Sequence, residues 1–335
     1  MKAIAIVDGQ LVWQEAPDPV AGPDEVSIRV YATAVNRADL SQRAGLYGPP
    51  PGKSLIVGLE CAGVVEADAG PWKAGDRVCA LLSGGGYAER AVAHVGHVLP
   101  IPDGLDFGDA AALPEVLATA WLNLWIEGGA KPGERIVLHA GASGVGTAAI
   151  QIAHAMGNPV LAIVGNETKR QACLALGADA AIDRHAGPWP AAVRAWAPDG
   201  VDLILDPVGG GTVADDLSLL ATGGRVVVIG LMGGRTAEVD LGRLMTKRLS
   251  IRGSVLRARS DAEKSTIVHS LTEHVWPLVR AGRIRPIVPT RLPIAEANHA
   301  HALLASDQTI GKVVLTVTDV TSAVTGWTSE PRRGN

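Results

Sequence analysis

One segment, Arg135–Gly146 with the sequence RIVLHAGASGVG, constrains the fold of this chain more than any other. Its apolar run at 136–138 is typical of a strand buried in a parallel sheet, and the following TAAIQIAHAMG is typical of a helix. Gly-Asn-Pro at 157–159 ends that helix, and VLAIV at 160–164 supplies a second strand. A βαβ unit therefore closes within about 30 residues, as a dinucleotide-binding fold requires.

The turn after the first strand holds Gly141, Gly144 and Gly146. We expect these glycines to allow positive φ and to let backbone N–H groups approach a diphosphate beside the positive end of the helix. A G-x-G-x-x-G fingerprint read from Gly141 meets Ser143 at its second glycine, so the bare motif also fits an ordinary tight strand-to-helix connection. A nucleophile elbow, G-x-S-x-G, fails because Val145 stands where its last glycine is needed. The surrounding strands and helix favour dinucleotide binding.

Length and composition limit the number of domains, the kinds of partner and the location that we expect. A chain of 335 residues with 47% hydrophobic residues exceeds what a single core usually supports, so we expect two domains. A net charge of -4 without a long basic run predicts neither a nucleic-acid nor a membrane partner and favours small molecules. No apolar run approaches the roughly 18 residues of a membrane span, and Cys61, Cys79 and Cys173 are widely spaced. We expect a soluble cytoplasmic protein with buried thiols.

The first part of the chain has the pattern of an all-β domain. KAIAIV and QLVW flank Asp8-Gly9 as a hairpin, and four short strands follow between Gly/Pro turns, in EVSIRVYATAV, ECAGVVEA, DRVCALL and YAERAVA. From about Leu117 the period becomes helical, and βα units then recur. Their strands are VDLILD, RVVVIG, LSIRGSV and a run near 180–182, and their helices cover 168–176, 190–197 and 212–221. This alternation predicts an α/β fold with a doubly wound parallel sheet.

The C-terminal part is expected to return to the first domain. The segment 261–282 predicts a long helix with a break near Pro277, and IRPIVPTRLP and GKVVLTV predict strands. We therefore expect a β domain from 1–116 and 284–318 and a Rossmann domain from 117–283. Residues 319–335 are expected to form a flexible tail.

Several motifs spread over residues 1–318 resemble the zinc-independent quinone oxidoreductases of the medium-chain dehydrogenase/reductase superfamily. They are NRADLSQRAGLYGPPPG, VGLECAGVV, GDRVCALLSGGGYAE, HAGASGVGTAAIQIA, LILDPVGG, VVIGLMGG and GKVVL. The similarity is greatest to the p53-induced quinone oxidoreductase subgroup. It implies a chaperonin-10-like (GroES-like) β domain, a Rossmann domain, NADPH as cofactor and a homodimer. The physiological acceptor stays open, because fold and cofactor do not determine it.

The resemblance also bears on metal binding. Zinc-dependent relatives place Cys and His where Asn36 and Leu59 stand, and their four-cysteine lobe has no counterpart here. We therefore expect no metal. His94 and His97 lie close together without accompanying cysteines or carboxylates, which favours a structural role. For His139, at the end of the first Rossmann strand, a hydrogen bond that fixes the turn is expected.

Without a metal, protein donors must stabilise the oxygen that becomes negative when hydride reaches the acceptor. Asn36 and Tyr47 are the candidate catalytic residues, because both lie in the segment that resembles the active-site wall of the family and both side chains can donate hydrogen bonds. Each has a structural alternative, since Tyr47 precedes Gly48 and three prolines and Asn36 can cap a turn. The resemblance implies cofactor contacts from Tyr47, Thr119, Ala140, Gly141, Ser143, Gly144, Val145, Gly165, Asn166, Lys169, Arg184, Val208, Gly230, Leu231, Met232, Leu256 and Arg257.

The end of the second Rossmann strand predicts the choice of cofactor. NAD sites usually place an acid there, about 20 residues after the glycine turn, but this strand ends at Gly165. Lys169 matches the phosphate-contacting lysine of related quinone reductases, and Arg184 offers a second cation or a stacking surface for adenine. Glu167 would repel a 2′-phosphate unless it points outward, and Arg170 fits a solvated helix face. We expect NADPH to bind more tightly than NADH.

The predicted activity is an NADPH-dependent, zinc-free reduction of quinones or similar conjugated carbonyl compounds. An enoyl-thioester reductase of the same superfamily is an alternative, and so is a non-enzymatic NADPH-binding protein. RVVVIG and LSIRGSV are expected at one end of the parallel sheet, where an apolar edge strand would pair with a second copy.

Overall fold

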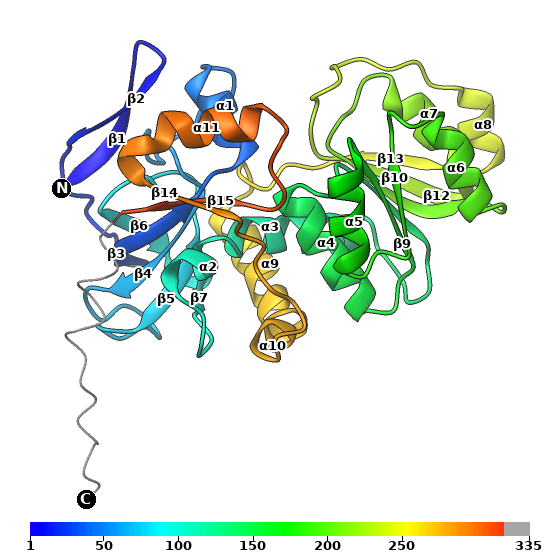
Figure 1. Ribbon diagram of the computed structural model, residues 1–335. Coiled ribbons are helices and arrows are strands. Elements are labelled where there is room, and N and C mark those ends of the chain that lie inside the picture. The colour runs from blue at the N-terminus through cyan, green and yellow to red at the C-terminus, as the bar shows by residue number, and fades with distance from the viewer. Residues whose placement is uncertain (318–335) are drawn as a thin grey trace, which may run out of the picture.

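The structure is a computed structural model that describes residues 1–317. Two sheet-containing bodies lie side by side, with helices between them (Figure 1). The predicted tail, 319–335, lies outside the described residues. Among the described residues, no helix is long and apolar enough to cross a bilayer.

The first body is built on a seven-stranded, largely antiparallel sheet with the order β14-β15-β3-β4-β5-β7, in which β6 also pairs with β3. Its strands are β3 (Glu25–Ala34), β4 (Glu60–Val65), β5 (Arg77–Leu81), β6 (Arg90–His94), β7 (Val98–Pro100), β14 (Thr290–Pro293) and β15 (Val313–Thr316). The hairpin of β1 (Lys2–Val7) and β2 (Gln10–Glu15) lies beside this sheet. Asp8 and Gly9 both have positive φ, as the predicted tight turn requires.

The return of the C-terminal segment to this body is confirmed. β15 pairs antiparallel with β3, and β14 pairs parallel with β15. Helix α11 (Ala297–Ala305), which the sequence pattern did not predict, lies between these two strands in the chain. Two further short helices, α1 (Arg37–Arg43) and α2 (Phe107–Ala111), were also not predicted.

The second body has a six-stranded, all-parallel sheet with the order β10-β9-β8-β11-β12-β13. Its strands are β8 (Ile136–His139), β9 (Val160–Val164), β10 (Ala180–Asp183), β11 (Val201–Asp206), β12 (Leu220–Val228) and β13 (Ser250–Gly253). Its helices are α4 (Gly144–Ala155), α5 (Glu167–Ala175), α6 (Trp189–Trp196), α7 (Thr212–Leu219) and α8 (Leu241–Thr246). This is the predicted doubly wound sheet, with its order reversing on either side of β8.

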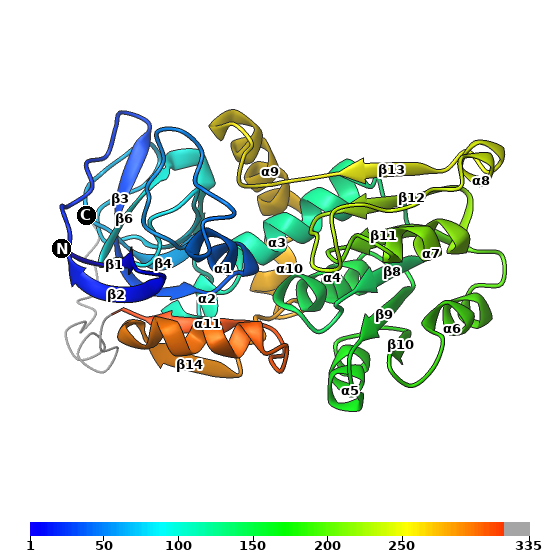
Figure 2. The same cartoon turned by 90° about the horizontal axis from the view of Figure 1, so that it is seen from above.

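The two bodies share one hydrophobic core. Helix α3 (Pro114–Trp121), the π-helical turn Leu122–Glu127, and helices α9 (Asp261–His274) and α10 (Trp276–Arg280) lie between the sheets in Figure 2. The break near Pro277 is therefore confirmed. The core cluster joins Leu99 of the first sheet to Leu138 of the second through Leu117 and Trp276, all at most 1% exposed. The same cluster includes residues of β3, β4, β5 and β15 in the first sheet and of β8, β9 and β11 in the second.

Candidate active site

The turn between β8 and α4 differs from the expectation in one respect. Positive φ falls on Ala140, at 51°, whereas Gly141, Gly144 and Gly146 are not in that region. The N–H of Gly141 donates to the carbonyl of Ile163 on β9 at 3.0 Å, which holds the turn close to the next strand. The predicted conformational role of the glycines was therefore wrong.

These glycines are needed for space instead. A Cβ on Gly146 would lie 2.4 Å from the carbonyl oxygen of Gly141, and a Cβ on Gly144 would lie 2.6 Å from Cδ of Lys312. The hydroxyl of Ser143 accepts a hydrogen bond from the N–H of Gly146 at 3.1 Å and caps α4. The helix therefore begins tightly against the turn, with a lysine of the first body packed on it.

The predicted cofactor residues after β9 and β10 come together. Asn166 caps α5 by accepting from the N–H of Lys169 at 2.9 Å. The guanidinium of Arg184 lies over Gly165, with Nη1 3.0 Å from where a Cβ would be. Both cations contact Asp307, whose Oδ1 is 2.8 Å from Nζ of Lys169 and whose Oδ2 is 3.6 Å from Nη2 of Arg184. No sequence pattern indicated this carboxylate.

Glu167 and Arg170 pair with each other on the exposed face of α5. Nε of Arg170 lies 2.6 Å from the Glu167 carboxylate, whose side chain is 64% exposed. Hydrogen bonds from Arg170 and Gln171 lower the pKa of Glu167 to about 2. Glu167 is therefore exposed and paired with Arg170, which is the arrangement in which it would not repel a 2′-phosphate.

The remaining predicted cofactor residues follow β11, β12 and β13. The N–H of Val208 donates to Oδ1 of Asp206 at 2.6 Å, and the carbonyl of Val208 accepts from Gly233 at 2.7 Å. Leu231 and Met232, next to Gly230, are 49% and 48% exposed, whereas Leu256 is buried. All these segments lie at the carboxyl edge of the parallel sheet, where dinucleotides bind in this fold.

Tyr47 and Arg257 form a second group, at the junction of the two bodies. The Arg257 guanidinium carbon lies 5.2 Å from the centre of the Tyr47 ring, and Nη1 donates to the carbonyl of Tyr47 at 3.2 Å. The same guanidinium bonds the carbonyl of Ser83 and the amide of Gln42, and it is buried. Burial and the nearby Glu115 raise the pKa of Tyr47, and Arg257 opposes them. Within residues 1–317, nothing bonds the Tyr47 hydroxyl.

The side chain of Asn36 is hydrogen-bonded within a buried polar cluster. Its Nδ2 donates to the carbonyl of Ala34 at 3.2 Å and to Oε1 of Glu60 at 2.9 Å, and its Oδ1 accepts from Nζ of Lys312 at 2.6 Å. Both amide hydrogens are engaged, so donation to an acceptor would require one of these bonds to break. Asn36 also precedes α1, and its N–H donates to the Asp39 carboxylate at 2.8 Å, which matches its structural alternative.

Glu115, at the start of α3, extends this cluster. Its N–H donates to Oε2 of Glu60 at 2.9 Å, and its carboxylate accepts a weak hydrogen bond from Thr119 at 3.4 Å. Burial and the charge of Glu60 raise the pKa of Glu115 to about 8, against the opposing charge of Lys312. Glu60, Glu115 and Lys312 were not predicted. For Glu60 and Lys312 the available signal was a charged residue directly beside an apolar strand, in VGLECAGVV and GKVVL.

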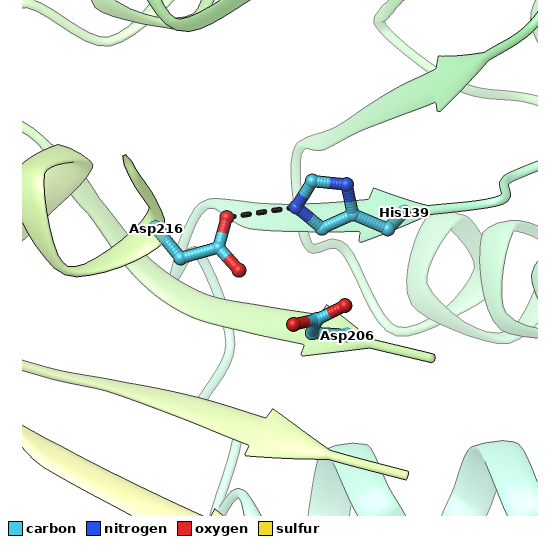
Figure 3. Close-up of side chains that lie close together, drawn as sticks. All are labelled: His139, Asp206 and Asp216. Atoms are coloured by element: carbon cyan, nitrogen blue, oxygen red, sulfur yellow. Dashed lines mark hydrogen bonds and ion pairs between the residues drawn. The ribbon is translucent and has the colours of Figure 1, made fainter. Parts of the chain in front are cut away.

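Asn36 and Leu59 stand where zinc-dependent relatives have zinc ligands, and neither side chain has a free ligand atom in this structure. Leu59 is buried and the atoms of Asn36 are engaged, as described above. Within residues 1–317, one group could hold a metal: His139, Asp206 and Asp216, on β8, β11 and α7 (Figure 3). Nε2 of His139 lies 2.7 Å from Oδ1 of Asp216, and Asp206 already accepts hydrogen bonds from the backbone after β11. His139 therefore bonds a neighbouring helix and not its own turn, which corrects the expectation.

His94 and His97 also have partners within the protein. Nδ1 of His94 accepts from the N–H of Gly96 at 3.1 Å, and Nε2 of His97 bonds the carbonyl of Asp261 at 2.9 Å. Burial lowers the pKa of His97 to about 4, against the opposing effect of the Asp261 carbonyl. The bond from His97, together with a contact of Ser265 Oγ with His94 Nδ1 at 3.3 Å, connects the first body to α9.

Comparisons with known proteins agree with this architecture. Residues 22–103 match the family described as Alcohol dehydrogenase GroES-like domain, and residues 144–271 match the family described as Zinc-binding dehydrogenase. The quinone oxidoreductase of Rattus norvegicus is 31% identical over 303 residues, covering 89% of this chain and 90% of the rat protein. The synaptic vesicle membrane protein VAT-1 homolog of Mus musculus is 29% identical over 323 residues, covering 91% of this chain and 80% of the mouse protein.

Solved structures give the same result. The quinone oxidoreductase of Thermus thermophilus, described with its NADPH complex, has a TM-score of 0.82 and 37% identity over 95% of this chain and all of that chain. The Escherichia coli quinone oxidoreductase complexed with NADPH has a TM-score of 0.84 and 28% identity, with the same coverage. The chain is an oxidoreductase and belongs to the quinone oxidoreductase family of the medium-chain dehydrogenases/reductases.

Proposed function

We propose that the protein transfers a hydride from NADPH to a quinone or a similar conjugated carbonyl acceptor, without zinc. The observation that carries this proposal is the convergence of Lys169 and Arg184 beside Gly165, where NAD-specific sites place an acid. The relatives described as NADPH complexes support the same cofactor.

The residues at the carboxyl edge of the sheet fit this cofactor. The capped N-terminus of α4 would face the diphosphate, with its N–H groups and helix dipole favouring the negative charge. Lys169 and Arg184 would hold the 2′-phosphate. The loops with Val208 and with Gly230, Leu231 and Met232 would line the rest of the dinucleotide. When bound, NADPH supplies the hydride at its nicotinamide ring.

The residues at the junction would then orient the acceptor. The hydroxyl of Tyr47, which no group in residues 1–317 bonds, would donate to the oxygen that becomes negative, and Arg257 holds the Tyr47 segment through its carbonyl and ring. Glu115, with a pKa of about 8, retains a proton at neutral pH in the same region. Asn36 would act indirectly, by orienting Lys312 and Glu60.

We further propose that the two domains divide as expected, with residues 1–116 and 284–318 forming the GroES-like domain and 117–283 the Rossmann domain. The sheet order supports this division, because the segment 284–317 supplies β14 and β15 to the first sheet. In this division the boundary at 116/117 falls within α3, whose residues from Leu117 onward belong to the second domain together with α9 and α10, and these helices pack against both domains.

A panel of acceptors tests the activity. Purified protein is mixed with NADPH and with ortho-quinones, para-quinones or 2-enoyl thioesters, and NADPH oxidation is followed by absorbance. We expect turnover with one or both quinone classes. Turnover with enoyl thioesters alone would replace the proposal with an enoyl-thioester reductase. NADPH binding without any turnover would indicate a non-enzymatic role.

A further inference from the structure

The two cations proposed for the 2′-phosphate share one carboxylate from the other sheet-containing body. Asp307 lies in the loop between α11 and β15. Its Oδ1 is 2.8 Å from Nζ of Lys169, its Oδ2 is 3.6 Å from Nη2 of Arg184, and its backbone carbonyl also accepts from Lys169. Within residues 1–317, no other carboxylate pairs with either cation.

The geometry makes Asp307 more than a solvated surface charge. The Lys169 side chain is 7% exposed, so its ammonium has little freedom to turn toward water. Burial raises the pKa of Asp307, but the hydrogen bond and charge of Lys169 and the charge of Arg184 outweigh it and lower the pKa overall. The carboxylate is therefore ionised at neutral pH and neutralises part of the positive charge beside Gly165.

We infer that Asp307 is a specificity-determining residue, which competes with a 2′-phosphate for Lys169 and Arg184 and so limits the preference for NADPH over NADH. The inference rests on the proposed function, because it takes these two cations as the phosphate site. A phosphate and a carboxylate both accept charge-assisted hydrogen bonds from Lys and Arg. A phosphate entering this site must either displace the Asp307 side chain or lie beside a like charge, and both lower its affinity.

The loop between α11 and β15 also contacts the turn between β8 and α4, which is proposed to face the diphosphate. The N–H of Gly311 donates to the carbonyl of Ala142 at 2.8 Å, and Gly311 and Ser143 form a parallel bridge. In Figure 1 this segment runs from the end of α11 toward α4. A phosphate that displaces Asp307 would therefore move a loop that is hydrogen-bonded to the turn between β8 and α4.

Asp307→Asn removes the charge with little other change. Asp307 has φ of 55°, a left-handed conformation that Asn adopts more readily than most residues, so the backbone should be retained. The contact from Lys169 to the backbone carbonyl is also kept. Glu167→Gln is the matched control, because it removes a negative charge from the start of α5 that is already paired with Arg170.

The experiment titrates the full chain with NADPH and with NADH by fluorescence, and with adenosine 2′-monophosphate and adenosine 5′-monophosphate as smaller probes. Asp307→Asn should lower the Kd for NADPH and for adenosine 2′-monophosphate by about tenfold, since one like charge is removed. The Kd values for NADH and adenosine 5′-monophosphate should stay within about twofold. Glu167→Gln should leave the ratio of NADPH to NADH affinity unchanged.

The inference would be overturned if Asp307→Asn had the wild-type ratio of NADPH to NADH affinity and also the wild-type melting temperature. So would a selective loss of NADH affinity, which would mean that Asp307 accepts a hydrogen bond from the ribose hydroxyl. The variant Lys169→Ala distinguishes failure of the inference about Asp307 from failure of the proposed function. If that variant weakens NADPH and NADH alike, the phosphate site itself is misplaced; if it weakens NADPH selectively while Asp307→Asn has no effect, only the inference about Asp307 fails.

Discussion

The Lys312 ammonium lies 2.7 Å from Oε1 of Glu60, and neither side chain is more than 5% exposed. The same ammonium donates to the carbonyl of Val35 and to Asn36, while its stem packs where a Cβ on Gly144 would be. One lysine from the end of the chain therefore connects the GroES-like sheet with the turn that is expected to hold the cofactor diphosphate.

Replacement of this lysine should be strongly destabilising. Lys312→Met leaves the Glu60 carboxylate buried without its cation, which typically costs about 3–5 kcal/mol in the free energy of unfolding. Urea denaturation measures the loss. Lys73→Met is the control, because Lys73 pairs with Asp68 at the surface and its side chain is 69% exposed; its effect should stay below about 1 kcal/mol. Equal stability of the two variants would show that the buried pair contributes little.

The raised pKa of Glu115 predicts a pH dependence of stability. The ordinary pKa is 4.5 and the folded value is about 8, so the folded protein retains a proton that the unfolded chain has lost between these values. The stabilising contribution of this proton is complete below about pH 4.5 and is lost as the pH rises through about 8.

Glu115→Gln keeps the hydrogen-bonding shape and abolishes this titration. Relative to wild type, the variant should gain on the order of 1–3 kcal/mol in unfolding free energy between about pH 5 and about pH 8.5. Glu167→Gln should show no such trend, because the pKa of Glu167 is lowered to about 2 and the group stays ionised over this range. A constant difference between wild type and Glu115→Gln would contradict the raised pKa.

Tyr47→Phe removes a hydroxyl that has no partner in residues 1–317. If this hydroxyl stabilises the reduced oxygen of the acceptor, kcat should fall roughly tenfold or more while NADPH affinity is retained. Tyr31→Phe, in a ring stacked on Phe107 in the first sheet, is the control. Unchanged kcat and KM would remove Tyr47 from the mechanism, and a large drop in melting temperature would instead favour the role of packing the loop.

The parallel sheet ends at β13, as RVVVIG and LSIRGSV predicted, and Ile251 on this strand is 40% exposed. An open edge strand with an exposed isoleucine favours pairing with a second copy, so light scattering at micromolar concentration should give twice the chain mass of 34.6 kDa. Ile251→Lys should shift the mass toward the monomer, whereas Val20→Lys, at a side chain 90% exposed elsewhere, should not. A monomeric wild type would refute the dimer.

The sequence predicted the parts of the site that depend on local pattern. Parallel strands bring their carboxyl ends to one edge, so Gly165, Lys169 and Arg184 were predicted together, from the strand ends and from the family resemblance, and they do lie together. Asp307 was not predicted, since it is 138 residues from Lys169 and reaches it only because the C-terminal segment returns to the first sheet.

The helices that were missed have a comparable explanation. Helix α1 has seven residues, and α11 is the run ANHAHALLA, in which alanine and histidine give a weak apolar stripe. Packing stabilises these helices more than their own sequences do. The buried positions of Glu60 and Lys312 also depend on tertiary contacts, because each charge is tolerated only beside the other.

Turnover after metal removal distinguishes metal-free hydride transfer from a zinc-dependent reaction. The protein is dialysed against a chelator, its zinc content is measured, and NADPH oxidation is followed with the quinone that the acceptor panel identifies. Metal-free hydride transfer predicts that kcat and kcat/KM remain at the values of the untreated protein while zinc falls well below one atom per chain. Loss of activity on chelation, restored by added zinc, would show that hydride transfer by this protein depends on zinc.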